Sequence, residues 1–145
     1  MKLPRTYTQN LSVSDKRKQL RAIEKSKRLY KKGEYFIRPK MKSFKSKPSR
    51  HVEKAKRMYN VTSMKHSLQL SKRTGCHIDG LKKIVQKGKG AYYSSGSRPS
   101  QTAESWGLAR LASALTGGKS SGIDIHILKE YCKPNSKPLK LAQTF

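Results

Sequence analysis

The sequence predicts a small, mainly helical protein with one or two short β-strands, a small α+β class in which short helices surround one central helix. Three observations predict this class. Apolar residues recur at helical spacing in several short segments that begin with a capping residue and end at a glycine. One segment near the C-terminus alternates β-branched and polar residues, as strands do. The 145-residue chain is only 34% hydrophobic, so we expect one small core flanked by an extended basic N-terminal arm and a C-terminal tail.

The basic arm is predicted to span residues 1–60 and to contain one long helix. Ser14 can cap a helix from Asp15 to about Lys32, and Gly33 can provide its left-handed stop. The apolar stripe of this helix is thin and consists of Leu20, Ile23 and Tyr30. Because cations cover most of the remaining surface, like-charge repulsion opposes the isolated helix, and an anionic partner would stabilise it.

The rest of the arm is predicted to alternate between extended and helical segments. Residues 34–38 (EYFIR) fit a short strand that ends at Pro39, and residues 40–47 form a basic linker. A short helix from Pro48 to Tyr59 follows. We expect an arm of this kind to thread between the surfaces of its partners.

A core domain is predicted over residues 61–132, with a Pro-broken tail over residues 133–145. Capping residues and glycine stops predict short helices over residues 63–73 and 80–87, and clustered glycines predict a loop over Gly88–Gln101. Thr102 can cap the strongest helix of the chain, Ala103–Thr116, which carries the only tryptophan, Trp106. Its apolar face consists of Leu108, Leu111, Ala112 and Leu115. A strand is predicted over Ile123–Leu128 (IDIHIL).

The charge of the chain restricts its partners. There are 34 Lys and Arg against 8 Asp and Glu, a net charge of +26. Residues 1–74 hold 23 of these cations against 4 acids, whereas residues 75–145 hold 11 against 4. A compact body with this charge repels itself and attracts polyanions. The N-terminal half is therefore predicted to grip an anionic partner.

The candidate contact residues lie in the arm and in the Gly88–Gln101 loop, with Lys87 just before that loop. The loop combines glycines, hydroxyl groups and two phenols near a helix N-terminus, which suits a phosphate or a carboxylate. An internally packed structural loop is the alternative, and its tyrosine pair could stack on bases or cover the core. The candidates are Lys16, Arg17, Lys18, Arg21, Lys25, Arg28, Lys42, Lys45, Lys47, Lys87, Lys89, Tyr92, Tyr93 and Arg98.

Motifs that would indicate an enzyme fail on spacing. The run TGGKS at 116–120 has Ser113 where a phosphate-binding loop needs glycine, and it follows a helix and precedes a predicted strand, the reverse of that motif. Asp124 and His126 share one face of the predicted strand, but no nucleophile is placed beside them. One conceivable set of zinc ligands fits no known spacing and consists of Cys76, His77, His126 and Cys132. We therefore expect no enzyme, cofactor, metal site or small-molecule substrate.

The cysteines and the hydropathy indicate the compartment. Two cysteines make no disulfide framework; one bridge is possible, but we expect reduced, half-buried thiols at Cys76 and Cys132 in a reducing compartment. No run of roughly 18 apolar residues predicts a membrane span. The N-terminal MKLPRTYTQN lacks the apolar stretch of a secretory signal. We expect the chain to remain in the cell that makes it, or in a particle assembled there.

The stretch GKGAYYSSGSRPSQTAESWGLARLASALTGGKS resembles the signature of an uncharacterised domain family of large double-stranded DNA viruses of algae and amoebae, with relatives in some tailed phages. YKKGEY at 30–35, KSFKSKPS at 42–49 and TGC at 74–76 fit the same family, so the resemblance covers roughly residues 5–132. The family supplies no activity and no catalytic residues to transfer. The resemblance implies a viral protein, plausibly of the virion.

Charge and resemblance together predict a minor structural protein of a large icosahedral DNA virus. It would cement capsid components by placing its basic segments against the acidic surfaces of other capsid proteins, in a virion assembled in the host cytoplasm. The alternative is a nucleic-acid-binding protein without sequence specificity that packages the viral DNA, because a charge of this size can neutralise many phosphates.

Overall fold

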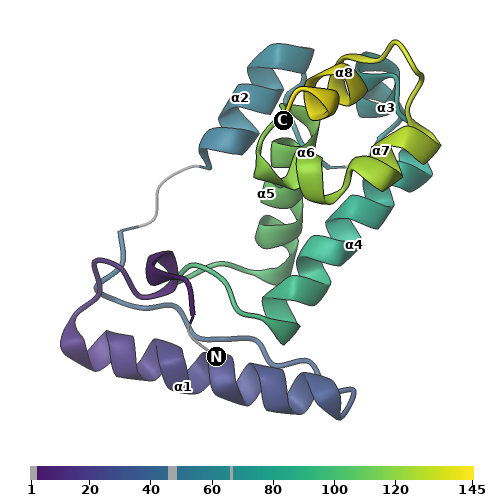
Figure 1. Ribbon diagram of the computed structural model, residues 1–145. Coiled ribbons are helices and arrows are strands. Elements are labelled where there is room, and N and C mark those ends of the chain that lie inside the picture. The colour runs from purple at the N-terminus through teal and green to yellow at the C-terminus, as the bar shows by residue number, and fades with distance from the viewer. Residues whose placement is uncertain (1–2, 46–48, 66) are drawn as a thin grey trace. The chain divides into compact units, whose positions relative to one another are not determined.

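The computed structural model describes residues 3–45, 49–65 and 67–145, and within these ranges it contains helices and no β-strand (Figure 1). A short 3-10 helix, η1 (Arg5–Tyr7), comes first. The α-helices are α1 (Val13–Lys31), α2 (Arg50–Tyr59), α3 (Leu68–Thr74), α4 (Ile78–Ser94), α5 (Ala103–Leu115), α6 (Lys119–Ile123), α7 (Ile125–Tyr131) and α8 (Lys137–Gln143). The predicted, mainly helical class is confirmed, whereas the short strands are not seen in the described part of the chain.

Both segments predicted as strands adopt other conformations. Residues 123–128 complete α6 and begin α7, because Ile127 and Leu128 turn together into the core while Ile123 stays exposed. Strict alternation would have placed Ile127 and Leu128 on opposite faces. Residues 34–38 carry no regular secondary structure, and Arg38 is buried whereas the apolar Tyr35 and Ile37 are exposed.

The described residues divide into two compact units, each built from two segments of the chain. The first unit lies within residues 1–47 and 89–106, and the second within residues 48–88 and 107–145. Helices α4 and α5 each contribute residues to both units. The sequence instead suggests consecutive domains, because nothing in its local pattern reports that α4 and α5 are shared.

The apolar core lies in the second unit. Its buried members are Ala55, Tyr59, Val61, Met64, Leu70, Cys76, Leu81, Ile84, Val85, Leu111, Ala112, Ala114, Leu115, Ile127, Leu128, Cys132, Leu139 and Ala142. The Tyr59 hydroxyl donates a hydrogen bond to the carbonyl of Leu115, and burial raises the pKa of this phenol. Helices α6, α7 and α8 pack against one another, so the predicted tail contains a helix that contributes Leu139 and Ala142 to the core.

The predicted loop from Gly88 is helical as far as Ser94, and the reason is helix packing. A Cβ atom on Gly88 would lie 2.6 Å from the Cα of Gly107, so the missing side chains allow the backbones of α4 and α5 to approach closely. Gly88, which suggested the start of a loop, is therefore a contact point between two helices. The prediction of a continuous loop over Gly88–Gln101 is wrong for its first half.

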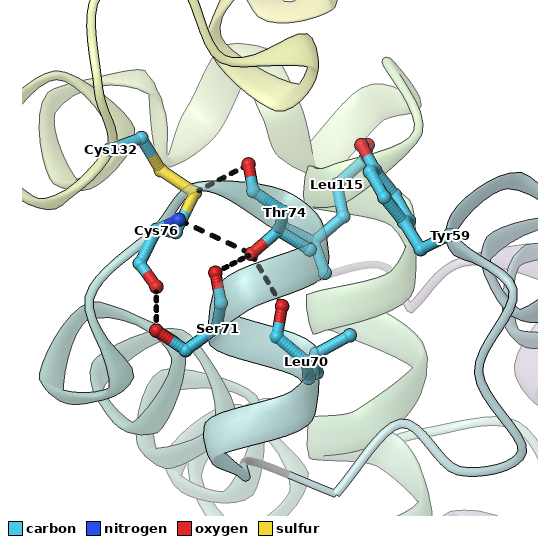
Figure 2. The surroundings of a disulfide bond; sticks show 7 residues. All are labelled: Tyr59, Leu70, Ser71, Thr74, Cys76, Leu115 and Cys132. Atoms are coloured by element: carbon cyan, nitrogen blue, oxygen red, sulfur yellow. Dashed lines mark hydrogen bonds between the residues drawn. A yellow bond between two sulfur atoms is a disulfide. The ribbon is translucent and has the colours of Figure 1, made fainter.

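Cys76 and Cys132 form a disulfide in this structure, which corrects the expectation of reduced thiols (Figure 2). An isolated antiparallel bridge brings the two cysteines together. The bridge is flanked by a hydrogen bond from the His77 N–H to the carbonyl of Tyr131 (2.8 Å) and one from the Lys133 N–H to the carbonyl of Gly75 (3.0 Å). The sequence separation of 56 residues hides this pairing, which depends on how the ends of α3 and α7 meet.

Hydrogen bonds from α3 hold the Cys76 side of the disulfide in place. Figure 2 shows the Ser71 hydroxyl donating to the carbonyl of Cys76 (2.5 Å) and the Cys76 N–H donating to Oγ1 of Thr74 (3.3 Å).

None of the described helices combines the length and apolar content required to cross a membrane.

Candidate polyanion-binding surface

Helix α1 carries six of the fourteen predicted contact residues. It begins two residues earlier than predicted, because Ser12 rather than Ser14 is the capping residue, and the Ser12 Oγ accepts a hydrogen bond from the Asp15 N–H (3.1 Å). The chain leaves the helix through Gly33, which adopts the predicted left-handed conformation with φ +82°. At 19 residues, α1 is about 28 Å long.

The outward side of α1 is densely cationic. Arg17, Arg21 and Arg28 follow one another at spacings of four and seven residues, so they form a single stripe about 16 Å long. No ion pair recorded between described residues includes any of the three. All six cations predicted on this helix are exposed, and we call them the outer face of α1: Lys16, Arg17, Lys18, Arg21, Lys25 and Arg28.

The inward side of α1 is more polar than its sequence suggests. Leu20, predicted to be buried, is 41% exposed, whereas Gln19 and Ser26 are buried beside Ile23. Gln19 Nε2 donates hydrogen bonds to the carbonyls of Tyr7 and Ser97, each at 3.2 Å. This side is therefore fixed by directional bonds, which leaves the cations on the opposite side of the helix.

The N-terminal end of α1 is joined to the segment that follows α1. The Asp15 carboxylate accepts hydrogen bonds from the backbone N–H (2.9 Å) and the hydroxyl (2.5 Å) of Ser43, and these bonds lower the pKa of Asp15 below its ordinary value. Lys42 and Lys45 on this segment are exposed, whereas Lys47 lies outside the described residues.

Arg38 is the residue that sequence reasoning missed. It is only 6% exposed, and its guanidinium donates to the carbonyl of Tyr92 (2.6 Å) and to the hydroxyls of Ser26 (3.1 Å) and Ser97 (2.6 Å). The guanidinium carbon lies 3.7 Å from the centre of the Tyr92 ring. Burial lowers the pKa of Arg38, but no carboxylate among the described residues pairs with it. A buried cation with uncharged hydrogen-bond acceptors therefore connects α1, the 34–40 segment and the end of α4.

The remaining candidates of the first unit are placed differently from one another. Tyr92 is buried, and its hydroxyl accepts a hydrogen bond from the Arg38 backbone N–H (3.2 Å), so this ring covers the interior. Tyr93 and Lys89 are half-buried, and Arg98 is exposed on the segment after α4. The predicted tyrosine pair therefore divides into one internal ring and one accessible ring.

Lys87 belongs to the second unit, where it joins a different cluster. Its Nζ lies 3.7 Å from Oδ1 of Asp124 and 3.4 Å from Nε2 of His126. Asp124 is fully buried, and its carboxylate accepts bidentate hydrogen bonds from the Arg110 guanidinium at 2.8 and 2.9 Å. These hydrogen bonds raise the pKa of Arg110. Because two cations already neutralise this carboxylate, it is a structural ion pair, and Lys87 is partly engaged within the chain.

The rejected motifs have structural explanations. In the TGGKS run, the Ser113 Oγ accepts a hydrogen bond from the Ser120 N–H (3.2 Å), and a five-residue helix follows instead of the predicted strand. Gly117 adopts φ +74° and ends α5. No group of three or more potential metal ligands occurs in the part of the chain that the structure describes. The site that remains is the outer face of α1 with the exposed cations near it.

Comparison with known proteins places the chain in a family without placing its activity. No curated protein and no solved structure gives a significant match. A family described as a family of unknown function, DUF5824, matches residues 4–127. This match covers the cationic helix, the Arg38 network and the helix that carries Trp106. The chain therefore belongs to the DUF5824 family.

Proposed function

We propose that this protein is a non-enzymatic structural protein that binds anionic surfaces of a large assembly through the outer face of α1. The setting that we propose is the virion of a large double-stranded DNA virus, where the chain would join capsid proteins by their acidic surfaces. The viral setting rests on the resemblance of the 88–120 stretch, and the binding mode rests on charge and geometry.

The single observation that carries the proposal is the separation of roles on α1. Its inward side is occupied by hydrogen bonds to fixed partners, whereas the six cations of its outer face have no ion pair among the described residues. Such a concentration of like charge costs free energy in an isolated helix. An opposing acidic surface removes that cost, and the guanidinium group of an arginine can form bidentate hydrogen bonds with a carboxylate.

The test reverses the charge of the arginine stripe on α1 and leaves the rest of the protein unchanged. A triple variant with Arg17→Glu, Arg21→Glu and Arg28→Glu is compared with a control of equal charge change in the second unit, made at three other exposed cations: Lys129→Glu, Lys133→Glu and Lys140→Glu. Infected cells supply tagged protein and particles, which are purified and crosslinked.

We expect the wild-type chain and the control to co-purify with particles and to crosslink from α1 to acidic capsid residues. The triple variant should be lost from particles, and salt should release the wild-type chain. Absence of the wild-type chain from purified particles would refute the virion setting. Retention of the triple variant would refute the role of α1.

A second candidate, nucleic-acid binding without sequence specificity, is favoured by a different observation. Aromatic rings with accessible surface lie in the same unit as the cationic helix, and acidic protein partners do not require them. Gel retention of DNA at two salt concentrations tests this candidate, and no retention at the lower concentration would remove it.

A further inference from the structure

Three tyrosines of the first unit form a surface cluster that the binding of an acidic protein does not explain. Tyr30 at the end of α1 and Tyr93 near the end of α4 stack with centroids 5.9 Å apart and ring planes within 9° of parallel. Tyr35 leans against both, at 4.9 Å from Tyr93 and 6.0 Å from Tyr30. We call Tyr30, Tyr35 and Tyr93 the tyrosine cluster.

The cluster is open to solvent on one side. Tyr35 is 72% exposed and Tyr30 and Tyr93 are half-buried, although an aromatic ring gains stability from burial. The Tyr30 hydroxyl lies beside α4 at Gly90, where a Cβ atom would make an ordinary van der Waals contact with it at 3.6 Å. The Tyr35 ring is therefore exposed to solvent while it contacts the rings of Tyr30 and Tyr93.

Cations border the cluster. Lys27 lies one turn before Tyr30 on α1, and Lys89 lies one turn before Tyr93 on α4, so each is a surface neighbour of a ring. Lys25 Nζ lies 4.7 Å from the centre of the Phe36 ring, beside Tyr35 in the chain. No ion pair within the described ranges includes Lys25, Lys27 or Lys89. The segments of this unit, 1–47 and 89–106, contain 18 Lys and Arg against 4 Asp and Glu.

We propose that the tyrosine cluster is a stacking platform for the bases of single-stranded nucleic acid, whose phosphates bind the bordering lysines. This inference rests on the second candidate function and narrows it to a class of ligand. Single strands combine accessible base faces with regularly spaced negative charge, and proteins bind them with aromatic rings inside basic grooves. A duplex keeps its bases stacked internally, and an acidic protein surface would neutralise the lysines while leaving the rings uncovered.

The experiment measures binding of a labelled oligo(dT) strand and of a duplex of equal length by fluorescence anisotropy. Tyr35→Ala should weaken binding of the strand by about 5- to 140-fold, the equivalent of about 1–3 kcal/mol for one stacked base. Its effect on the duplex should stay below about twofold. Tyr35→Phe keeps the ring and should bind like the wild-type chain, and Phe145→Ala removes an exposed aromatic ring from the second unit as a matched control.

A second measurement reports the phosphate contacts separately. The salt dependence of strand binding should fall in slope by about 0.7 for Lys89→Gln, because one phosphate contact is lost. An unchanged slope would remove Lys89 from the site.

The possible outcomes separate the two proposals. Equal binding of the strand by Tyr35→Ala and the wild-type chain would overturn the stacking platform while leaving nucleic-acid binding by α1 intact. Failure of the wild-type chain to bind either ligand would overturn both. Binding of polyglutamate that is weakened equally by Tyr35→Ala would assign the cluster to a protein partner and overturn this inference.

Discussion

The disulfide allows the most quantitative prediction about the stability of this fold. The perturbation is removal of the Cys76–Cys132 bond, either by reduction of the wild-type chain or in a double variant with Cys76→Ala and Cys132→Ala. Both cysteines are buried in the core of the second unit, and two backbone hydrogen bonds flank them. The native contacts can therefore persist after the bond is gone, so the main effect falls on the unfolded chain.

The magnitude follows from the length of chain that the bond closes. The two cysteines are 56 residues apart, and α4 to α7 lie between them. In the chain-entropy description, a loop of this length restricts the unfolded state by about 4 kcal/mol at 25 °C. We expect the free energy of unfolding of the second unit to fall by about that amount when the bond is removed.

The assay is guanidinium unfolding followed by circular dichroism, on oxidised protein, reduced protein and the double alanine variant. Alkylation of free thiols followed by mass spectrometry first establishes that the starting material is oxidised. Reduced protein and the double variant should unfold at similar, lower denaturant concentrations. A loss below about 1 kcal/mol in both would refute the reasoning, because it would show that the bond does not restrict the unfolded chain as its length requires.

Four further predictions follow from buried or closely packed groups. Arg38→Met leaves the hydroxyl and carbonyl partners of the guanidinium unpaired, so hydrogen exchange in α1 should accelerate by the equivalent of about 3 kcal/mol while α8 stays protected. Arg110→Ala leaves the buried carboxylate of Asp124 without its main partner and should cost about 3–5 kcal/mol in thermal or denaturant unfolding, part of which Asp124→Asn should restore in the same background. The lowered pKa of Asp15 stabilises the fold above the ordinary pKa of an aspartate, near 3.8, so the stability difference between the wild-type chain and Asp15→Asn should shrink as pH falls below that value; a difference that grows in acid would contradict this sign. Gly88→Ala places a methyl group 2.6 Å from a backbone atom of α5 and should lower the melting temperature by the equivalent of about 1–3 kcal/mol, which a thermal scan measures.

Local sequence signals predicted the helices whose ends are set by their own residues. Ser49 caps α2, and Gly33 and Gly75 follow α1 and α3 in the left-handed conformation. The Thr102 hydroxyl accepts a hydrogen bond from the Ser105 N–H (3.0 Å) at the start of α5, as its sequence predicts. These features depend on neighbours in the chain, so they can be recognised without knowing the fold.

Three of the incorrect predictions share a physical cause, because each depends on segments that are distant in the sequence. Gly88 by itself predicts a loop, but in the fold it lies opposite Gly107 in a contact between two helices. The two cysteines are distant in the sequence, and the ends of α3 and α7 bring them together. The IDIHIL run has the residues of a strand, but no second strand is present in the described ranges to pair with it. Tertiary contacts decided each case against the local propensity.

The charge of the candidate site could be predicted from the sequence, but the buried contacts that hold the site in place could not. Exposure of the cations on α1 follows from their density, since so many lysines and arginines cannot be buried. Burial of Arg38 could not be predicted, because alternation in the EYFIR run places it on the same side as Glu34 and opposite the apolar Ile37. The tyrosine cluster could not be predicted, because it joins α1 to α4, and the helical part of α4 beyond Gly88 was itself unexpected.

The interiors of the two units differ in a way that bears on binding. The second unit is held by apolar side chains and a disulfide. The first unit buries Gln19, Ser26, Arg38 and Ser97 and has few large apolar side chains inside, while its surface carries unneutralised cations. Hydrogen bonds contribute only modestly to net stability, so this unit has a small margin against the repulsion of its own charge. A ligand that binds only the folded form stabilises it by an amount that increases with the ligand concentration relative to Kd. An anion bound at α1 would therefore stabilise the Arg38 network that positions both the cations and the tyrosine cluster.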